Sequence, residues 1–230
     1  MFRLLTVAAL GASLLTPAGA PTRAPVLVEL FTSEGCSSCP PADRVLAALD
    51  PYAIVLSEHV DYWDHLGWRD PFSSHASTLR QEAYARIFNT EGPYTPQMVI
   101  DGAVQFNGSE GRRAQEEIER ASRRERTAVH LARVPAGLEI SIDPVPRACD
   151  VMLAFAQDAA ASQVTAGENR GRSLQHVAIL RSLRKIGPIK KGAAFHQTVE
   201  IPRDAADGRV IVFAQESGPG RISGAAMLAK

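Results

Sequence analysis

The chain has 230 residues, and its 25 Lys and Arg residues balance 25 Asp and Glu residues, so the formal net charge is zero. This balance excludes a strongly basic chain and gives no sign of a polyanion partner, so we expect no nucleic-acid partner. Three cysteines are too few for a small fold stapled by disulfides. The length predicts one large domain or two small ones, and we expect two.

The N-terminus carries the three parts of a secretory signal peptide. Arg3 precedes an apolar stretch from Leu4 to Leu15, and small residues end the segment at Ala20. We therefore assign residues 1–20 to a signal peptide and expect the mature protein in the periplasm or outside the cell, with an uncleaved anchor as the alternative. A bilayer span takes about 20 apolar residues, and since no segment is that long we expect no stable membrane span.

Two cysteines follow the first predicted strand. Branched and aromatic residues from Val26 to Phe31 are typical of a buried strand, and a helix that ends near Leu49 comes next. Cys36 and Cys39 lie in the turn between them, separated by two serines. Redox proteins hold two sulfurs close enough to bond or exchange in such a turn. In an oxidising compartment we expect a Cys36–Cys39 disulfide unless a partner reduces it.

The elements that follow continue to alternate. They are a strand over 53–57, a polar and aromatic loop over 58–68, a helix over 74–88, strands over 97–100 and 103–106 joined by an Asp101-Gly102 turn, and a charged helix over 109–126. The predicted order is therefore strand, helix, strand, helix, strand, strand, helix.

This order resembles the thioredoxin fold over residues 25–126, with Thr95-Pro96 directly before the third strand. In that fold the first two strands are parallel and the third is antiparallel, so the resemblance brings the cysteine turn, the loop over 59–68 and Thr95-Pro96 to one edge of the sheet. It also implies a cis Thr95–Pro96 bond that offers the Thr95 backbone to an extended substrate. An ordinary trans proline is the alternative.

Longer phrases of the sequence point to one family. These phrases cover residues 29–43, 59–64, 66–72, 94–98 and 167–172. They are similar to an uncharacterised family of secreted bacterial proteins within the thioredoxin-like superfamily, a domain of unknown function. The resemblance extends nearly to the C-terminus and implies no substrate.

Position in the turn predicts different roles for the two sulfurs. Cys36 lies nearer the tip and is expected to attack, whereas Cys39 is expected to resolve the mixed disulfide. Pro40 favours Cys39 as a helix cap over a helical residue. The charge of Glu34 opposes a thiolate at Cys36, so we expect a weaker oxidant than the disulfide-forming enzymes of the periplasm. A disulfide that only staples the turn is the alternative.

Four other residues are candidates for the same site. Glu29 lies in an otherwise apolar strand, and beneath the turn it would take the proton of Cys39, as a buried acid does in thioredoxin. Facing solvent or the second domain, it would do nothing chemical. Asp61, Trp63 and His59 are candidates to line a substrate groove, with turn capping and packing as the alternative.

A soft-metal site is the main competing interpretation. Two thiolates with His59 or His65 would suit copper(I) or zinc. The possible ligands have no tight local spacing, so we expect neither a resident metal nor another cofactor.

After residue 127 apolar residues recur at every second position. Six runs predict a small antiparallel β-sandwich over 127–230, namely 129–134, 138–142, 151–156, 176–183, 195–201 and 210–214. No catalytic motif lies here. We expect Cys149 to be a buried apolar residue, and His130, His176 and His196 to be structural. Residues 167–172 are a predicted surface loop and a candidate cover for the first domain.

The sequence thus predicts an exported α/β protein, a thioredoxin-like fold followed by a small antiparallel β-sandwich domain. We expect it to exchange disulfides with polypeptide thiols through Cys36 and Cys39, with an unidentified reductant or oxidant as the second partner. Metal handling and a non-enzymatic binding module with an architectural disulfide are the alternatives. Exchange requires sulfurs that a second molecule can reach.

Overall fold

The structure is a computed structural model that describes residues 25–201 and 208–228. The predicted signal peptide, residues 1–20, lies outside the described residues. Within the described ranges, no helix is long and apolar enough to cross a membrane.

The first half of the chain alternates strands and helices in the predicted order. Its elements are β1 (Leu27–Thr32), α1 (Cys39–Leu49), β2 (Ile54–His59), α2 (His75–Phe88), β3 (Gln97–Ile100), β4 (Val104–Asn107) and α3 (Gly111–Ser122). β1 pairs with β2 in parallel and with β3 in antiparallel orientation. The predicted Asp101-Gly102 turn joins β3 to β4, and both of its residues have positive φ.

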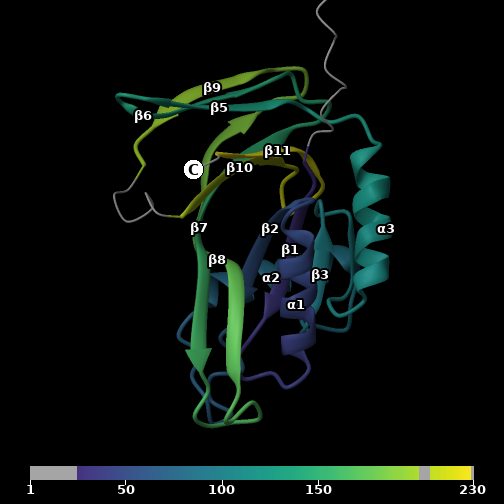
Figure 1. The fold of residues 1–230 in the computed structure, drawn as a ribbon. Helices are drawn as coiled ribbons and strands as arrows, with labels where there is room; N and C mark the ends of the chain where they lie inside the picture. The colour runs from purple at the N-terminus through teal and green to yellow at the C-terminus, as the bar shows by residue number, and fades with distance from the viewer. Residues whose placement is uncertain (1–24, 202–207, 229–230) are drawn as a thin grey trace, which may run out of the picture.

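Helices cover both faces of this part of the sheet (Figure 1). α1 and α3 pack on one face, where Leu30 of β1 shares an apolar cluster with Leu46 of α1. α2 packs on the other face, where the Tyr84 ring lies edge-on to Phe31. Successive residues of a strand point to opposite faces, so Glu29 lies on the same side as Phe31, toward α2.

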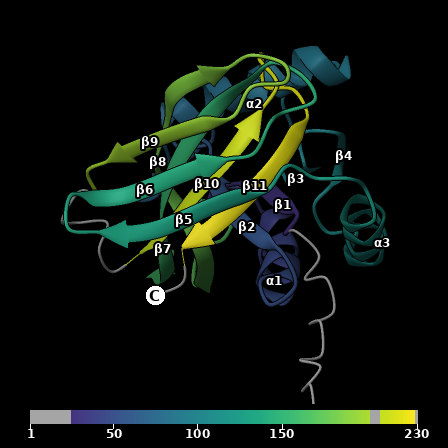
Figure 2. The ribbon, with the colours of Figure 1, turned by 90° about the horizontal axis from the view of Figure 1, so that it is seen from above.

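The second half of the chain adds strands to the same sheet. β7 (Cys149–Gln163), β8 (Ser173–Ile189), β10 (Arg209–Gln215) and β11 (Ile222–Leu228) extend it to eight strands, in the order β11-β10-β7-β8-β2-β1-β3-β4. A second, three-stranded antiparallel sheet contains β5 (Val129–Val134), β6 (Gly137–Ile142) and β9 (Phe195–Val199), and lies across β7 and β10 (Figure 2).

The mixed α/β class is confirmed in outline, as a large sheet with a small antiparallel one. The predicted boundary at residues 126 and 127, however, does not separate two sheets. Leu56 of β2 and Phe213 of β10 belong to one apolar cluster, and β8 meets β2 in parallel at the pair Ser57 and Ile179. Alternation of apolar residues defines the two faces of a strand and leaves its neighbours open, so the sequence could not indicate this joining.

The hairpin of β7 and β8 is much longer than predicted. The two strands have 15 and 17 residues, and their far ends run down beside the helices of the first half (Figure 1). Residues 164–172 connect them, and we call this segment the cap loop. It reaches the turn that contains the two cysteines, which makes the hairpin part of the candidate site.

Candidate functional site

Cys36 and Cys39 form a disulfide at the start of α1. The sulfurs are 2.15 Å apart and the Cα atoms 5.4 Å apart. The Cys39 N–H donates to the Cys36 carbonyl at 3.2 Å, which closes the turn. Ser38 is the residue before the helix and proline occupies its first turn, where backbone N–H groups have no helical partner. Cys39 is therefore the first helical residue, and the prediction that it caps the helix is wrong by one position.

Neither cysteine is accessible to solvent in this conformation. Cys36 and Cys39 each expose 0% of their surface, although Ser37 and Ser38 between them are exposed. A thiolate of another molecule cannot reach either sulfur without a movement of the covering residues. This burial blocks disulfide exchange with a second protein in the conformation described.

The cap loop is hydrogen-bonded to the cysteine turn. Asn169 is fully buried, and its side-chain amide donates to the carbonyls of Glu34 at 2.8 Å and Cys36 at 2.9 Å. The carboxylate of Glu168 accepts the Ser37 N–H at 3.1 Å. These contacts place residues 167–172 against the cysteine turn. The sequence suggested this loop as a cover for the first domain.

A close approach of two loops positions the cap. Gly167 has φ of 70°, which is unfavourable for most residues, and a Cβ atom at this position would lie 3.0 Å from the Cβ of Trp68. Glycine therefore allows the cap loop to pack directly on the loop between β2 and α2.

Three predicted segments meet at the disulfide. A Cβ atom at Gly35 would lie 3.0 Å from the Trp63 Cβ, so Trp63 packs on the cysteine turn. Its indole N–H donates to the Thr95 hydroxyl at 2.9 Å. The Thr95–Pro96 peptide bond is cis, as the thioredoxin resemblance implied. The cysteine turn, Trp63 and Thr95-Pro96 therefore lie side by side.

Asp61 contacts α2. Its carboxylate accepts hydrogen bonds from the Thr78 hydroxyl at 2.5 Å and contacts the His75 ring at 3.0 Å. Burial opposes ionisation, but these two partners outweigh it and lower the pKa of Asp61. The Asp61 carboxylate therefore contacts side chains at the start of α2.

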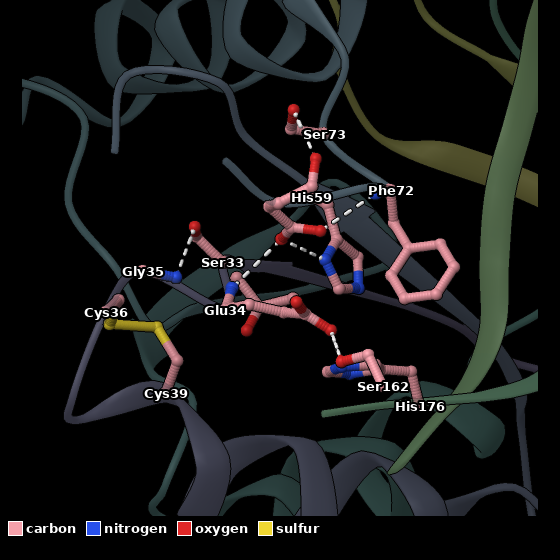
Figure 3. Close-up of polar contacts among 12 residues, drawn as sticks. Ser33, Glu34, Gly35, Cys36, Cys39, His59, Phe72, Ser73, Ser162 and His176 are labelled. Carbon is pink, nitrogen blue, oxygen red and sulfur yellow. Dashed lines mark hydrogen bonds and ion pairs between the residues drawn. A yellow bond between two sulfur atoms is a disulfide. The ribbon is translucent and has the colours of Figure 1, made fainter. Parts of the chain in front are cut away.

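A buried cluster of acids and histidines lies beside the disulfide (Figure 3). His59 contacts Asp70 at 2.7 Å, and Asp70 also accepts the Glu34 N–H at 2.9 Å. His176 of β8 contacts the Glu34 carboxylate at 3.1 Å and the Asp43 carboxylate at 3.8 Å. We call these five residues the acid–histidine cluster.

His59 belongs to this cluster and not to a substrate surface. Its side chain is fully buried, and its ring centroid lies 4.6 Å from that of His176. The structure therefore does not support a role for His59 in binding a substrate in this conformation. A buried partner on a strand outside the first half could not be anticipated from local spacing.

The carboxylate of Glu34 binds three hydrogen-bonding side chains despite its burial. Its carboxylate accepts from Ser162 of β7, from His176 of β8 and from the Trp68 indole at 2.8 Å. Burial favours the neutral acid, but these contacts outweigh it and lower the pKa of Glu34. The sequence predicts that the charge of Glu34 opposes a thiolate at Cys36. In the structure His176 and two other side chains stabilise this charge.

The pKa of His176 shifts in the opposite direction to that of Glu34. Burial favours the neutral imidazole, yet the hydrogen bond with Glu34 and the charges of Asp43, Glu34 and Asp70 raise its pKa. The residue was expected to be structural, and its contacts tie β8 to the cysteine turn.

Asp43 is a site residue that the sequence reasoning missed. It lies on α1 four residues after Cys39, a spacing that puts two side chains on the same helix face. Its carboxylate accepts the Thr32 hydroxyl at 2.9 Å. Burial raises its pKa, and the charges of His176 and His59 oppose the rise only in part. The four-residue spacing was the signal that could have identified it.

Glu29 lies on the face of the sheet away from α1. Its carboxylate is 2.5 Å from Arg80 and accepts the Tyr84 hydroxyl at 2.6 Å. Arg80 is also 3.4 Å from Glu58. Burial and the charge of Glu29 raise the pKa of Glu58 well above its usual value. Glu29 is therefore the charge partner of Arg80, and the predicted transfer of the Cys39 proton to Glu29 has no contact to act through.

The described residues contain no group of three or more His, Cys, Asp or Glu side chains arranged to hold a metal ion. His59 is engaged with Asp70, and His65 is exposed on its loop. Cys149 is a buried free thiol on β7, as predicted.

Comparisons with known proteins place the chain among uncharacterised proteins. Residues 27–215 match the family described as "Protein of unknown function (DUF1223)". The crystal structure of protein AGR_C_4864 from Agrobacterium tumefaciens is similar, with 28% sequence identity, a TM-score of 0.78, and coverage of 91% of this chain and 96% of that chain. HBP35 of Porphyromonas gingivalis shares the fold at 14% identity, with a TM-score of 0.61 and coverage of 90% and 75%. No curated protein matches the chain.

Glu29→Gln is expected to lower the free energy of unfolding by about 1 to 3 kcal/mol, because it removes the charge that Arg80 contacts in a buried site. Urea denaturation measures this loss. The rate at which a phosphine reduces the disulfide of the native protein should not change, since Glu29 lies on the other face of the sheet. Glu116→Gln, at a half-exposed position of α3, should change neither quantity. A slower reduction of the disulfide in Glu29→Gln would contradict this placement, because it would show that Glu29 affects the cysteine pair.

Proposed function

Because the chain belongs to the DUF1223 family of proteins of unknown function, we propose a function from its own residues: thiol–disulfide exchange with polypeptide thiols through Cys36 and Cys39. We interpret residues 25–126 as a thioredoxin-like module for this reaction, in a protein exported from the cytoplasm. The observation that supports the proposal is the disulfide at the first turn of α1, in a turn that packs on Trp63, whose indole N–H donates to Thr95.

The proposed exchange starts from the oxidised pair. A substrate thiolate attacks the Cys36 sulfur, the Cys36–Cys39 bond breaks, and Cys39 leaves as a thiolate. A second thiolate of the substrate then attacks its own sulfur in the mixed disulfide and releases Cys36 as a thiolate. The substrate loses two electrons and gains a disulfide, while the cysteine pair gains two electrons. A polypeptide disulfide restores the pair by the reverse steps.

Asp43 is the carboxylate best placed to handle the Cys39 proton. It lies one helical turn after Cys39 and is buried, and burial raises its pKa, which favours its acid form. In that form it can donate a proton to the leaving Cys39 thiolate and take it back when Cys39 attacks.

The closed cap loop means that exchange needs a conformational opening. Asn169 must release the carbonyls of Glu34 and Cys36, and Glu168 must release the Ser37 N–H. Such local openings take less free energy than global unfolding where few apolar contacts are lost. We therefore propose a gated site in which a resting disulfide is uncovered before it reacts.

The same burial supports a second candidate, a non-enzymatic binding module whose disulfide is architectural. Both cysteines expose 0% of their surface, and a sealed disulfide that staples a turn needs no access. In this case the bond would be reduced only when the whole protein unfolds. The two candidates differ in whether a local opening exposes the sulfurs.

Cys39→Ala removes the resolving thiol, so an exchange protein should accumulate polypeptide mixed disulfides on Cys36. The variant, incubated with oxidised periplasmic proteins, should give adducts on non-reducing gels that disappear on reduction and map to Cys36 by mass spectrometry. Cys36→Ala is the control and should give none. Adducts confined to Cys149, or no adducts at all, would favour the architectural disulfide.

Asn169→Ala should loosen the cap by removing two buried hydrogen bonds. We expect the native-state rate of disulfide reduction by a phosphine to rise about tenfold or more, as two such bonds allow. At low urea the rate should be independent of urea concentration, which marks a local opening. Gln175→Ala, at an exposed position of β8, is the control. If reduction of both variants follows global unfolding at every urea concentration, the gate does not exist.

Asp43→Asn should slow the resolution of a mixed disulfide by Cys39, because the amide cannot accept a proton. We expect a loss of at least about tenfold in the rate of ring closure from a Cys36–glutathione adduct at neutral pH. Stopped-flow quenching with mass spectrometry measures this step. Glu29→Gln is the matched control, and equal rates in the two variants would remove Asp43 from the mechanism.

A further inference from the structure

Beside the cysteine turn, the side chain of Glu34 contacts both strands of the β7–β8 hairpin. Ser162 of β7 and His176 of β8 both bind the carboxylate of Glu34, two residues before Cys36 (Figure 3). The cap loop lies between these two hairpin positions. A change at this carboxylate therefore acts on the two strands that carry the cap.

His176 is the titratable member of this fastening. It exposes 3% of its surface and reaches Glu34 through Nε2. Among the described residues its other ring nitrogen, Nδ1, has no hydrogen-bond partner and lies 3.8 Å from the Asp43 carboxylate. The imidazole thus lies between two carboxylates, an arrangement that favours its charged form.

The groups that face His176 come from four elements. They are Glu34 from the segment between β1 and α1, Asp43 from α1, His59 from β2, and Asp70 from the segment between β2 and α2. Three are acids, so a positive charge on His176 is compensated from several sides. A neutral His176 leaves these acids with less compensation.

We propose that the contact between His176 and Glu34 is a pH-sensitive latch, which holds the cap loop over the disulfide at mildly acidic pH and releases it as the pH rises. The latch would regulate access to the disulfide, so its biological role rests on the proposed exchange function.

The pKa directions agree with this geometry. The pKa of His176 is raised above its ordinary value of 6.5, so its contribution to closure is complete below that value and is lost as the pH rises through the higher one. The pKa of Glu34 is lowered from 4.5, so its contribution is lost only when the pH falls through the lower value. Closure is strongest between the pKa values of Glu34 and His176.

The latch is tested by reduction of the native disulfide with a phosphine at pH 5.5 to 8, in the full-length oxidised protein. Each rate is divided by that of His176→Gln at the same pH, which cancels the pH dependence of the reagent. Glutamine can still donate to Glu34 but does not titrate. We expect the ratio to rise roughly three- to tenfold across this range, the size expected for one hydrogen bond to a charged group. His196→Gln, at an exposed position of β9, should behave as the wild type.

A second measurement needs no variant. The Ser37 N–H is held by Glu168 of the cap loop, so its hydrogen exchange, corrected for the intrinsic effect of pH, should speed up over the same range. A flat rate ratio together with a flat corrected exchange rate would overturn the latch.

The outcomes separate the latch from the exchange function. A rising ratio without polypeptide adducts on Cys39→Ala keeps the latch and removes the exchange function. Adducts with a flat ratio and flat corrected exchange keep the exchange function and remove the latch.

Discussion

The structure of the candidate site depends on the buried carboxylate of Glu34. A carboxylate without exposed surface is costly unless donors surround it, and here the donors come from β7, β8 and the loop after β2. Removing one of these donors would leave a buried charge with fewer partners. The need to satisfy one charge therefore holds together segments that are about 140 residues apart along the chain.

The two halves of the chain also form one sheet. The first half provides the disulfide, and the second half provides the residues that cover it and compensate the charge beside it. Leu56 and Phe213 share an apolar cluster, so the halves also share a core. Division of the chain at residue 127 separates residues that contact one another beside the disulfide.

Local sequence patterns predicted the first half well. The strand of β1, the helix of α2 and the Asp101-Gly102 turn each depend on residues close together in the chain. The meeting of the cysteine turn with Thr95-Pro96 followed from the order of the strands. The sequence left the orientation of Glu29 open, because its position in an apolar strand gives burial but not the face, which packing against Arg80 decides.

The second half was harder, for a physical reason. The tip of the β7–β8 hairpin, over residues 157–163 and 173–177, lacks a continuous apolar alternation because much of it is exposed, so strand lengths were underestimated. The cluster of His176 with Glu34 and Asp43 joins residues far apart in sequence, and no local spacing predicts such a pairing. β11 also was not predicted, since its small residues, such as Gly224 and Ala225, are poor signals for a strand.

The junction between β2 and β8 has a mechanical consequence. Only Ser57 and Ile179 are paired across it, and the neighbouring Ala178 has φ of 51°, an uncommon angle for alanine. Sliding of one strand along the other would therefore break very few backbone hydrogen bonds at this seam. The eight strands form one sheet. The pairing of β2 with β8 is its mechanically weak point, and the β7–β8 hairpin extends from this junction.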